Sequence, residues 1–127
     1  SKRPKRHYGS NDDETIREIT EFSLGTKSEA AQIKVLFALN GVSYPLASVI
    51  LHFAFPDKYP ILDFRALWSL GWKQPKSYNF DFWQKYCDKI RGISRETGEN
   101  IRTIDKALWE YSKENQKNDG ETNDEAV

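Results

Sequence analysis

The chain has 127 residues, of which 38% are hydrophobic, and its 19 basic side chains equal its 19 acidic ones in number. This length suits one domain with a modest core, and the single cysteine excludes a disulfide within the chain and a cysteine-rich zinc site. There is no run of about 18 apolar residues and no signal-peptide pattern, so we expect a cytoplasmic protein without a membrane partner. A dedicated nucleic-acid coat is usually basic, so the zero net charge argues mildly against one.

The charges are unevenly distributed along the chain. Residues 1–10 are basic and lack periodicity, which predicts a flexible arm or the truncated end of a longer chain. Residues 115–127 are polar and acidic, which predicts a disordered tail. Without that tail the remainder is mildly positive, and we expect residues 11–114 to form one helical domain. The basic residues of the first segment are Lys2, Arg3, Lys5, Arg6 and His7, and the acids that follow Asn118 are Asp119, Glu121, Asp124 and Glu125.

Apolar residues recur at helical spacing through the central segment, and no alternating strand pattern of useful length is present. Capping residues and glycines divide this segment into six predicted helices, which indicates the all-α class. In chain order the predicted ranges are about 11–25, 28–39, 46–55, 63–70, 80–96 and 100–113. The third range is apolar on nearly every face, so we expect it to be a buried central helix.

The turn between the second and third predicted helices is a candidate phosphate-binding element. It reads Leu39-Asn40-Gly41-Val42-Ser43 and joins two apolar helices. Such a hairpin aims consecutive backbone N–H groups and the positive end of the second helix at one phosphate. Gly41 allows a backbone conformation that other residues avoid. The bare pattern also joins helices that bind nothing, so by itself it leaves both interpretations open.

The longer segment from Leu39 to Asp63 narrows the choice. After the hairpin come Ala47-Ser48-Val49-Ile50-Leu51 and then Tyr59-Pro60-Ile61-Leu62-Asp63. This run resembles the helix-hairpin-helix DNA glycosylase superfamily, in its adenine glycosylase and endonuclease III branch. There a Leu-Pro-Gly-Val-Gly hairpin precedes an Ala-rich apolar helix and a Phe-Pro-Ile-Leu-Asp-like ending. The match needs no gap between glycine and aspartate, and it covers roughly a fifth of the chain.

The resemblance implies a DNA partner and assigns roles by position. Asp63 takes the place of the catalytic carboxylate, which stabilises positive charge on the sugar or activates the nucleophile. The alternative is that Asp63 only caps the helix that follows it, and both roles can hold together. Arg65 is either a phosphate partner or one half of an ion pair with an acid such as Asp105. The expected DNA-binding residues are Asn40, Gly41, Val42, Ser43, Tyr44, Lys58 and Arg65.

Departures from the family pattern limit what the resemblance implies. The lysine of the bifunctional members is absent, since Ser43-Tyr44-Pro45-Leu46 stands there, so we expect monofunctional base excision without lyase activity. Ser43 replaces the second hairpin glycine, and the iron–sulfur cysteines are absent, so no cluster is expected. Some relatives hold a monovalent cation at the hairpin turn, and the sequence leaves that open. Only 38 residues precede the hairpin, so either the chain is a fragment or half of the base pocket is missing. The alternative function is a non-catalytic DNA-binding or protein-interaction module that retains only the fold.

The remaining reactive residue types have structural explanations. We expect Cys87 to be a small buried apolar group, His52 a satisfied core or edge histidine, and no metal site. Asp105 is expected in a structural pair, and Trp109 is expected to pack. Stacking on a flipped base is conceivable for three other tryptophans, although packing is their commoner fate. These are Trp68, Trp72 and Trp83.

Overall fold

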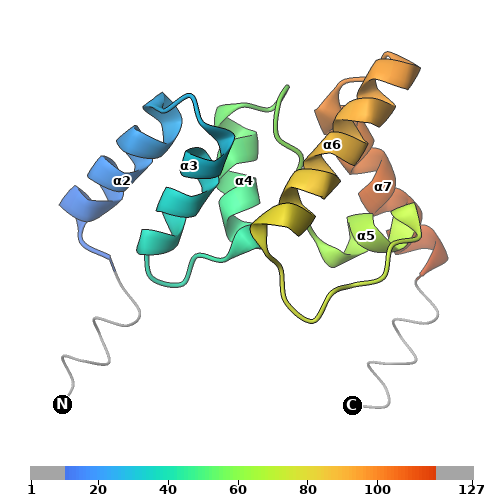
Figure 1. Cartoon of the computed structure of the whole chain (residues 1–127). Coiled ribbons are helices and arrows are strands. Elements are labelled where there is room, and N and C mark those ends of the chain that lie inside the picture. The colour runs from blue at the N-terminus through green and yellow to red at the C-terminus, as the bar shows by residue number, and fades with distance from the viewer. Residues whose placement is uncertain (1–10, 117–127) are drawn as a thin grey trace.

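The computed structural model describes residues 11–116, which form only helices, turns and loops (Figure 1). The all-α class with about six helices is confirmed for this part of the chain. The α-helices are α2 (Asp13–Gly25), α3 (Glu29–Lys34), α4 (Tyr44–Ala54), α5 (Phe64–Leu70), α6 (Phe80–Thr97) and α7 (Ile101–Asn115), and a 3-10 helix spans Val35–Ala38. The predicted basic arm lies outside the described residues, as does all of the predicted tail beyond Gln116.

Side-chain caps explain most of the helix boundaries. Asp12, Ser28, Asp63, Asn79 and Asn100 each accept the backbone N–H three residues further on. Each bond satisfies one of the N–H groups that a helix start leaves without an intrahelical partner. Five of the six α-helices therefore begin where a short polar side chain can fold back onto the helix.

Two predicted helices differ in detail from the structure. The second does not continue as an α-helix to Leu39, because it tightens after Lys34 into the 3-10 helix. Tighter turns of this kind are common at helix ends. The third begins at Tyr44 rather than Leu46, and this places Pro45 in its first turn, where a missing N–H costs nothing.

The core joins an N-terminal group of helices, α2 to α4, to a C-terminal group, α5 to α7 (Figure 1). The ring of Tyr59 stacks on that of Trp83 with centroids 5.6 Å apart. The Tyr59 hydroxyl donates to the Gln32 side chain of α3. Because Tyr59 lies in the loop between the two groups, these contacts fix how the groups meet. The buried apolar residues are Ile33, Leu36, Ala47, Leu51, Tyr59, Leu62, Ala66, Leu67, Trp83, Tyr86, Cys87, Ile90, Ile101 and Ile104.

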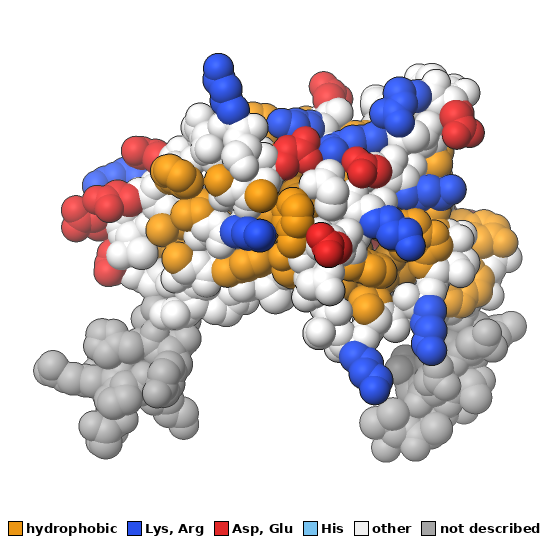
Figure 2. Space-filling view, in the orientation of Figure 1, with side chains coloured by type: hydrophobic (Ala, Val, Ile, Leu, Met, Phe, Trp, Pro, Cys, Tyr) orange, Lys and Arg blue, Asp and Glu red, His pale blue; other side chains and the backbone are white. Residues whose placement is uncertain are grey.

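Helix α4 is buried on one face only, so the prediction that nearly every face is covered is wrong. Ala47 and Leu51 are buried, whereas Leu46 is 46% exposed and Phe53 is 70% exposed. Neighbouring elements cover one side of this short helix, and its other apolar side faces solvent. Hydrophobic side chains are likewise visible on the molecular surface in Figure 2. Within residues 11–116, no helix combines the length and apolar character that crossing a membrane needs.

Candidate functional site

The predicted hairpin turn has the backbone conformation that its glycine suggests. Gly41 has a φ angle of +82°, in the left-handed region. The N–H of Val42 donates to the carbonyl of Leu39 at 3.3 Å, which closes the turn. The Asn11 side chain brackets the peptide groups of Asn40, accepting its N–H at 2.8 Å and donating to its carbonyl at 3.3 Å. Two of the N–H groups expected to meet a phosphate therefore already have partners within the protein.

The start of α4 is arranged differently from the other α-helix starts among the described residues. Its N-cap, Ser43, makes no side-chain hydrogen bond to the helix. Pro45 removes one donor, and the N–H groups of Ser43 and Tyr44 make no hydrogen bond with any described residue. The positive end of α4 thus presents free backbone donors at the hairpin turn.

The segment that precedes Asp63 is tied to this end of α4 by a buried hydroxyl. Ser48 donates to the carbonyl of Pro45 at 2.7 Å and accepts the N–H of Leu62 at 2.9 Å. Its side chain is completely buried. Because the first turn of α4 and Leu62 share one hydroxyl, Asp63 starts α5 close to the hairpin end of α4.

The two peptide groups of Ile61 are held from the other side. Asp105 of α7 accepts the Ile61 N–H at 2.9 Å, and Tyr86 of α6 donates to its carbonyl at 2.8 Å. These bonds satisfy groups that an extended buried segment would otherwise leave without partners. Side chains from α4, α6 and α7 thus fix the segment that leads to Asp63.

Two tyrosines near the site have raised pKa values, each with a contribution from a carboxylate. Burial raises the pKa of Tyr44 and the charge of Asp81 adds to this shift. Burial likewise raises the pKa of Tyr78, with a contribution from Asp63.

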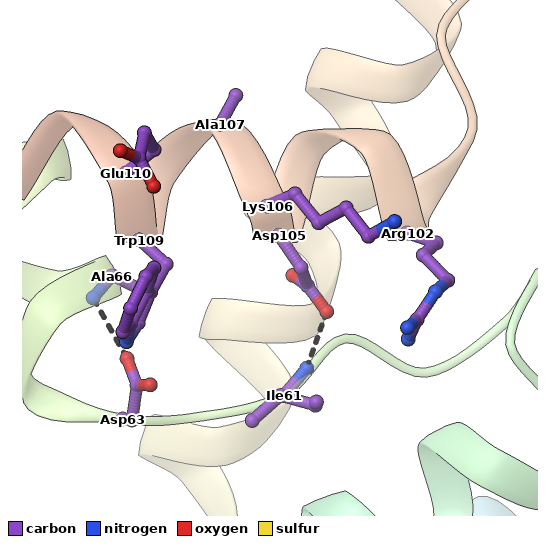
Figure 3. A pocket seen from close by; sticks show the side chains of 9 residues that line it. All are labelled: Ile61, Asp63, Ala66, Arg102, Asp105, Lys106, Ala107, Trp109 and Glu110. Atoms are coloured by element: carbon purple, nitrogen blue, oxygen red, sulfur yellow. Dashed lines mark hydrogen bonds between the residues drawn. The ribbon is translucent and has the colours of Figure 1, made fainter.

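Asp63 lines an open cleft of about 540 Å³ between the start of α5 and α7 (Figure 3). In Figure 3 the Asp63 side chain rises from the lower wall and that of Asp105 descends from α7. Cavities of a few hundred cubic ångströms accommodate small molecules. The lining residues are Ile61, Asp63, Ala66, Arg102, Asp105, Lys106, Ala107, Trp109 and Glu110.

The two roles expected for Asp63 are compatible in the structure. Its Oδ1 atom accepts the N–H of Ala66 at 2.8 Å, so Asp63 is the N-cap of α5. The same side chain faces the cleft. The cap fixes the carboxylate in one orientation at the positive end of a helix, which is a suitable setting for a preorganised anion.

Asp105 is a second cleft carboxyl, and its part in the cleft was not foreseen in the sequence. Its side chain is only 11% exposed. Burial raises the pKa of Asp105 to about 7; the nearby Asp63 charge also raises it, while the Ile61 N–H and Arg102 lower it. Its Oδ1 atom is buried and makes no hydrogen bond. A carboxyl in this setting keeps its proton at pH values where ordinary solvent-exposed aspartates are ionised.

His52 is the satisfied core histidine that the sequence predicts. It is 1% exposed, and its Nδ1 atom lies 2.7 Å from the carbonyl oxygen of Tyr59. Arg102 lies 3.2 Å from Nε2 and has only donors, so Nε2 accepts and the ring proton is on Nδ1. The 3.6 Å separation between Nδ1 and Asp105 is therefore not a charge pair in this tautomer.

Lys58 and Arg65 occupy different surroundings from those expected of DNA contacts. Lys58 follows the C-terminal end of α4, opposite the hairpin (Figure 1), and its ammonium lies 3.9 Å from Glu29. Arg65 is on α5 and its guanidinium lies 5.7 Å from the centre of the Trp109 ring. Its hydrogen bond goes to Ser112 at 3.4 Å, so the expected alternative pair with Asp105 does not form. Of the two cations, only Arg65 lies near the cleft.

The tryptophans divide between core and cleft. Trp83 is fully buried, as expected, and Trp72 packs against the core. Trp109 is 41% exposed and lines the cleft, so it packs only in part. Cys87 is buried and its pKa is raised to about 12, chiefly by burial, so its thiol is inert as predicted.

Comparison with known proteins adds no assignment. No protein-family model, no curated protein and no solved structure matches the chain. Among residues 11–116, no three His, Cys, Asp or Glu side chains gather in the way a metal ion would require.

Proposed function

We propose that this chain is a DNA-binding domain of the helix-hairpin-helix glycosylase type that excises a base by a monofunctional mechanism using Asp63. The observation that supports this most is the position of Asp63. It lines an open cleft, and the Ser48 hydroxyl ties its segment to the uncapped start of α4. A phosphate-binding end and a carboxylate-bearing cleft are the two features that such a reaction needs on one side of a domain.

The phosphate would meet the free N–H groups of Ser43 and Tyr44 at the positive end of α4. Because the net charge is zero, there is little long-range attraction between the protein and DNA. The backbone N–H groups of Ser43 and Tyr44 would therefore fix the position of the domain along the DNA. The N–H groups of Asn40 and Val42, which serve the turn itself, fix the hairpin conformation instead. Binding should therefore weaken with salt less steeply than for a protein with many lysine contacts.

The chemistry would require a nucleotide that has left the base stack, because the glycosidic bond is inaccessible within a duplex. Asp63 would place its carboxylate beside the sugar, where positive charge develops as the base departs. The first turn of α4 holds Ser43, Tyr44, Pro45 and Leu46, with no lysine to form a Schiff base. The products would be a free base and an abasic site, and the strand would stay intact.

Single-turnover excision tests this proposal with Asp63→Asn as the main variant. Duplexes carrying uracil, adenine opposite 8-oxoguanine, or an alkylated base serve as substrates. Asparagine is as good an N-cap as aspartate, so the variant keeps the Ala66 hydrogen bond and loses only the charge. We expect excision to fall by about a hundredfold or more. Asp57→Asn, in an exposed loop, makes the same acid-to-amide change away from the cleft and should leave the rate unchanged.

Equal rates for wild type and Asp63→Asn would contradict the catalytic role. DNA binding without excision of any base would instead support the second candidate, a non-catalytic DNA-binding module. One observation favours that candidate: Asp63 caps α5 by accepting the Ala66 N–H, and this is by itself a sufficient structural reason for an aspartate at position 63. The Asp63→Asn comparison separates the two candidates because asparagine preserves the cap.

A further inference from the structure

We propose that Asp105 is the proton donor of this cleft and delivers its proton to the leaving base, directly or through one water. This inference rests on the proposed function and adds a second residue to its chemistry. Asp63 and Asp105 line the same cleft from opposite walls (Figure 3). Two carboxyls whose surroundings differ can divide the ionised and protonated roles of one reaction.

The two carboxyls differ in their hydrogen-bond partners and in their burial. Asp63 sits at the start of α5, where its Oδ1 atom accepts the backbone N–H of Ala66. Asp105 lies in the second turn of α7, its side chain is 11% exposed, and only its Oδ2 atom has a hydrogen-bond donor. Its Oδ1 atom is buried without a partner. Ionisation would leave that oxygen bare in a poorly hydrated site, so the neutral form is favoured there.

The proton of Asp105 belongs on Oδ1. Oδ2 accepts the N–H of Ile61 and cannot point a proton at the same donor. Burial of Oδ1 in the free protein is compatible with donation, because catalytic contacts often form only once substrate is bound. Trp109 lies four residues after Asp105 and thus on the same face of α7, and its partly exposed ring borders the cleft.

Charged and titratable groups surround Asp105 from every neighbouring element. The charge of Asp63 favours a protonated Asp105, and Arg102 opposes this. His52 of α4 makes its two hydrogen bonds to the Tyr59 carbonyl and to Arg102. From α6 come two groups whose own pKa values burial raises, so both are uncharged at neutral pH; these are Tyr86 and Cys87.

The proposed step balances as a hydrolysis. The bond between the sugar carbon and the base nitrogen breaks, and its electron pair goes to the base. The base takes the proton of Asp105. A water molecule adds its oxygen to the sugar carbon and gives one proton to Asp63. Solvent then returns a proton from Asp63 to Asp105, so the net change is one water consumed and one base released.

The first test follows the Asp105 carboxyl in the DNA-free protein by ¹³C NMR. We expect its titration midpoint near pH 7, and a lower midpoint in Asp63→Asn, because that variant removes a negative charge that raises the pKa. A midpoint below about 5, close to that of an ordinary aspartate, would overturn the inference whether or not the protein excises bases.

The second test is the pH profile of single-turnover excision for wild type and Asp105→Asn. Asparagine still accepts the Ile61 N–H, so the variant keeps the segment in place. The wild-type rate should decline above pH 7; Asp105→Asn should be about a hundredfold slower and lack that decline. Circular dichroism and the thermal midpoint check its fold, and Asp57→Asn is the control.

The outcomes separate the two proposals. Excision that depends on Asp63 but has a flat pH profile, or is unaffected by Asp105→Asn, would overturn the donor role and leave the proposed function standing. No excision on any duplex, with Asp105 still titrating near pH 7, would overturn the proposed function and the donor role with it. An Asp63-dependent rate that declines with the Asp105 titration supports both.

Discussion

The hairpin turn and the segment before Asp63 reach their conformations by opposite means. At the hairpin turn Gly41 adopts a left-handed conformation, the Asn11 side chain holds the peptide groups of Asn40, and the start of α4 has no side-chain cap. The segment at Ile61 and Leu62 has no regular secondary structure, and side chains from three helices satisfy its peptide groups. The first arrangement leaves donors free for a partner, whereas the second uses its polar groups to hold a carboxylate in place. Backbone N–H groups without a partner in the protein can bind a ligand, whereas those already bonded to side chains hold the segment in position.

The largest expected effect concerns the buried carboxyl of the cleft. The pKa of Asp105 is raised to about 7 in the folded protein and is about 3.9 in an unfolded chain. Between these values the folded state binds more protons than the unfolded one, so the free energy of unfolding should fall as pH rises from about 4 to 7. Asp105→Asn should remove this decline, which is of the order of a few kcal/mol.

Urea unfolding at a series of pH values measures that difference between wild type and Asp105→Asn. At pH 8 the variant should be at least as stable as wild type, because it no longer buries a charge. Asp57→Asn, at an exposed position, should follow the wild-type curve. Parallel curves for wild type and Asp105→Asn would mean that Asp105 is ionised throughout this range.

The next effect is loss of the hydroxyl that joins α4 to the cleft segment. Ser48→Ala leaves the buried N–H of Leu62 without its acceptor. An unsatisfied buried donor costs about 1–3 kcal/mol, and the midpoint of urea unfolding should fall accordingly. An unchanged midpoint would show that water or another group replaces the hydroxyl and that the tie to α4 is unnecessary.

A smaller loss is expected at the glycine of the hairpin. In Gly41→Ala the added methyl group meets no atom within 4 Å, but the φ angle of +82° is unfavourable for alanine. Part of the strain of about 1–2 kcal/mol is offset by the lower entropy of the unfolded chain, so we expect a net loss of about 1 kcal/mol. Gly25→Ala also has open space and has no positive φ angle, so it should be neutral or stabilising. Equal effects at the two glycines would contradict a strained hairpin.

The smallest effect should come from the N-cap of α4. An N-cap serine usually contributes about 1 kcal/mol through its hydroxyl, but Ser43 makes no such bond. Ser43→Ala should therefore change the free energy of unfolding by less than about 0.5 kcal/mol. Ser48→Ala is the matched control, since it removes the same group from a bonded site on the same helix. A loss near 1 kcal/mol at Ser43 would mean that the hydroxyl caps α4 in solution.

Local patterns predicted the fold class, most of the helix ends and the left-handed hairpin glycine. Caps such as Asp63 and turn glycines act over a few residues, so they can be recognised in the sequence. The exposure of Phe53 could not be predicted, because an apolar helix does not specify which of its faces a neighbour covers. The position of Lys58 relative to the hairpin likewise depends on the length and direction of α4.

The cleft was only half predictable. Asp63 followed from the resemblance, whereas Asp105 lies 42 residues further along and meets it through the packing of α7 against α5 and the segment at Ile61. The spacing of Asp105 and Trp109, four residues apart, places them on one helical face. That signal was present in the sequence, but spacing alone does not distinguish a face that packs from one that borders a cleft.

The most direct measurement of the central claim is amide mapping by NMR while the protein is titrated with a short duplex that contains a stable abasic-site analogue. The account predicts that the amide signals of Ser43, Tyr44 and residues 63–66 shift together with one affinity, while that of Lys58, at the other end of α4, stays in place. Shifts confined to the Lys58 end, or absent from both the hairpin and the cleft, would contradict a DNA-binding surface that joins the uncapped start of α4 to Asp63.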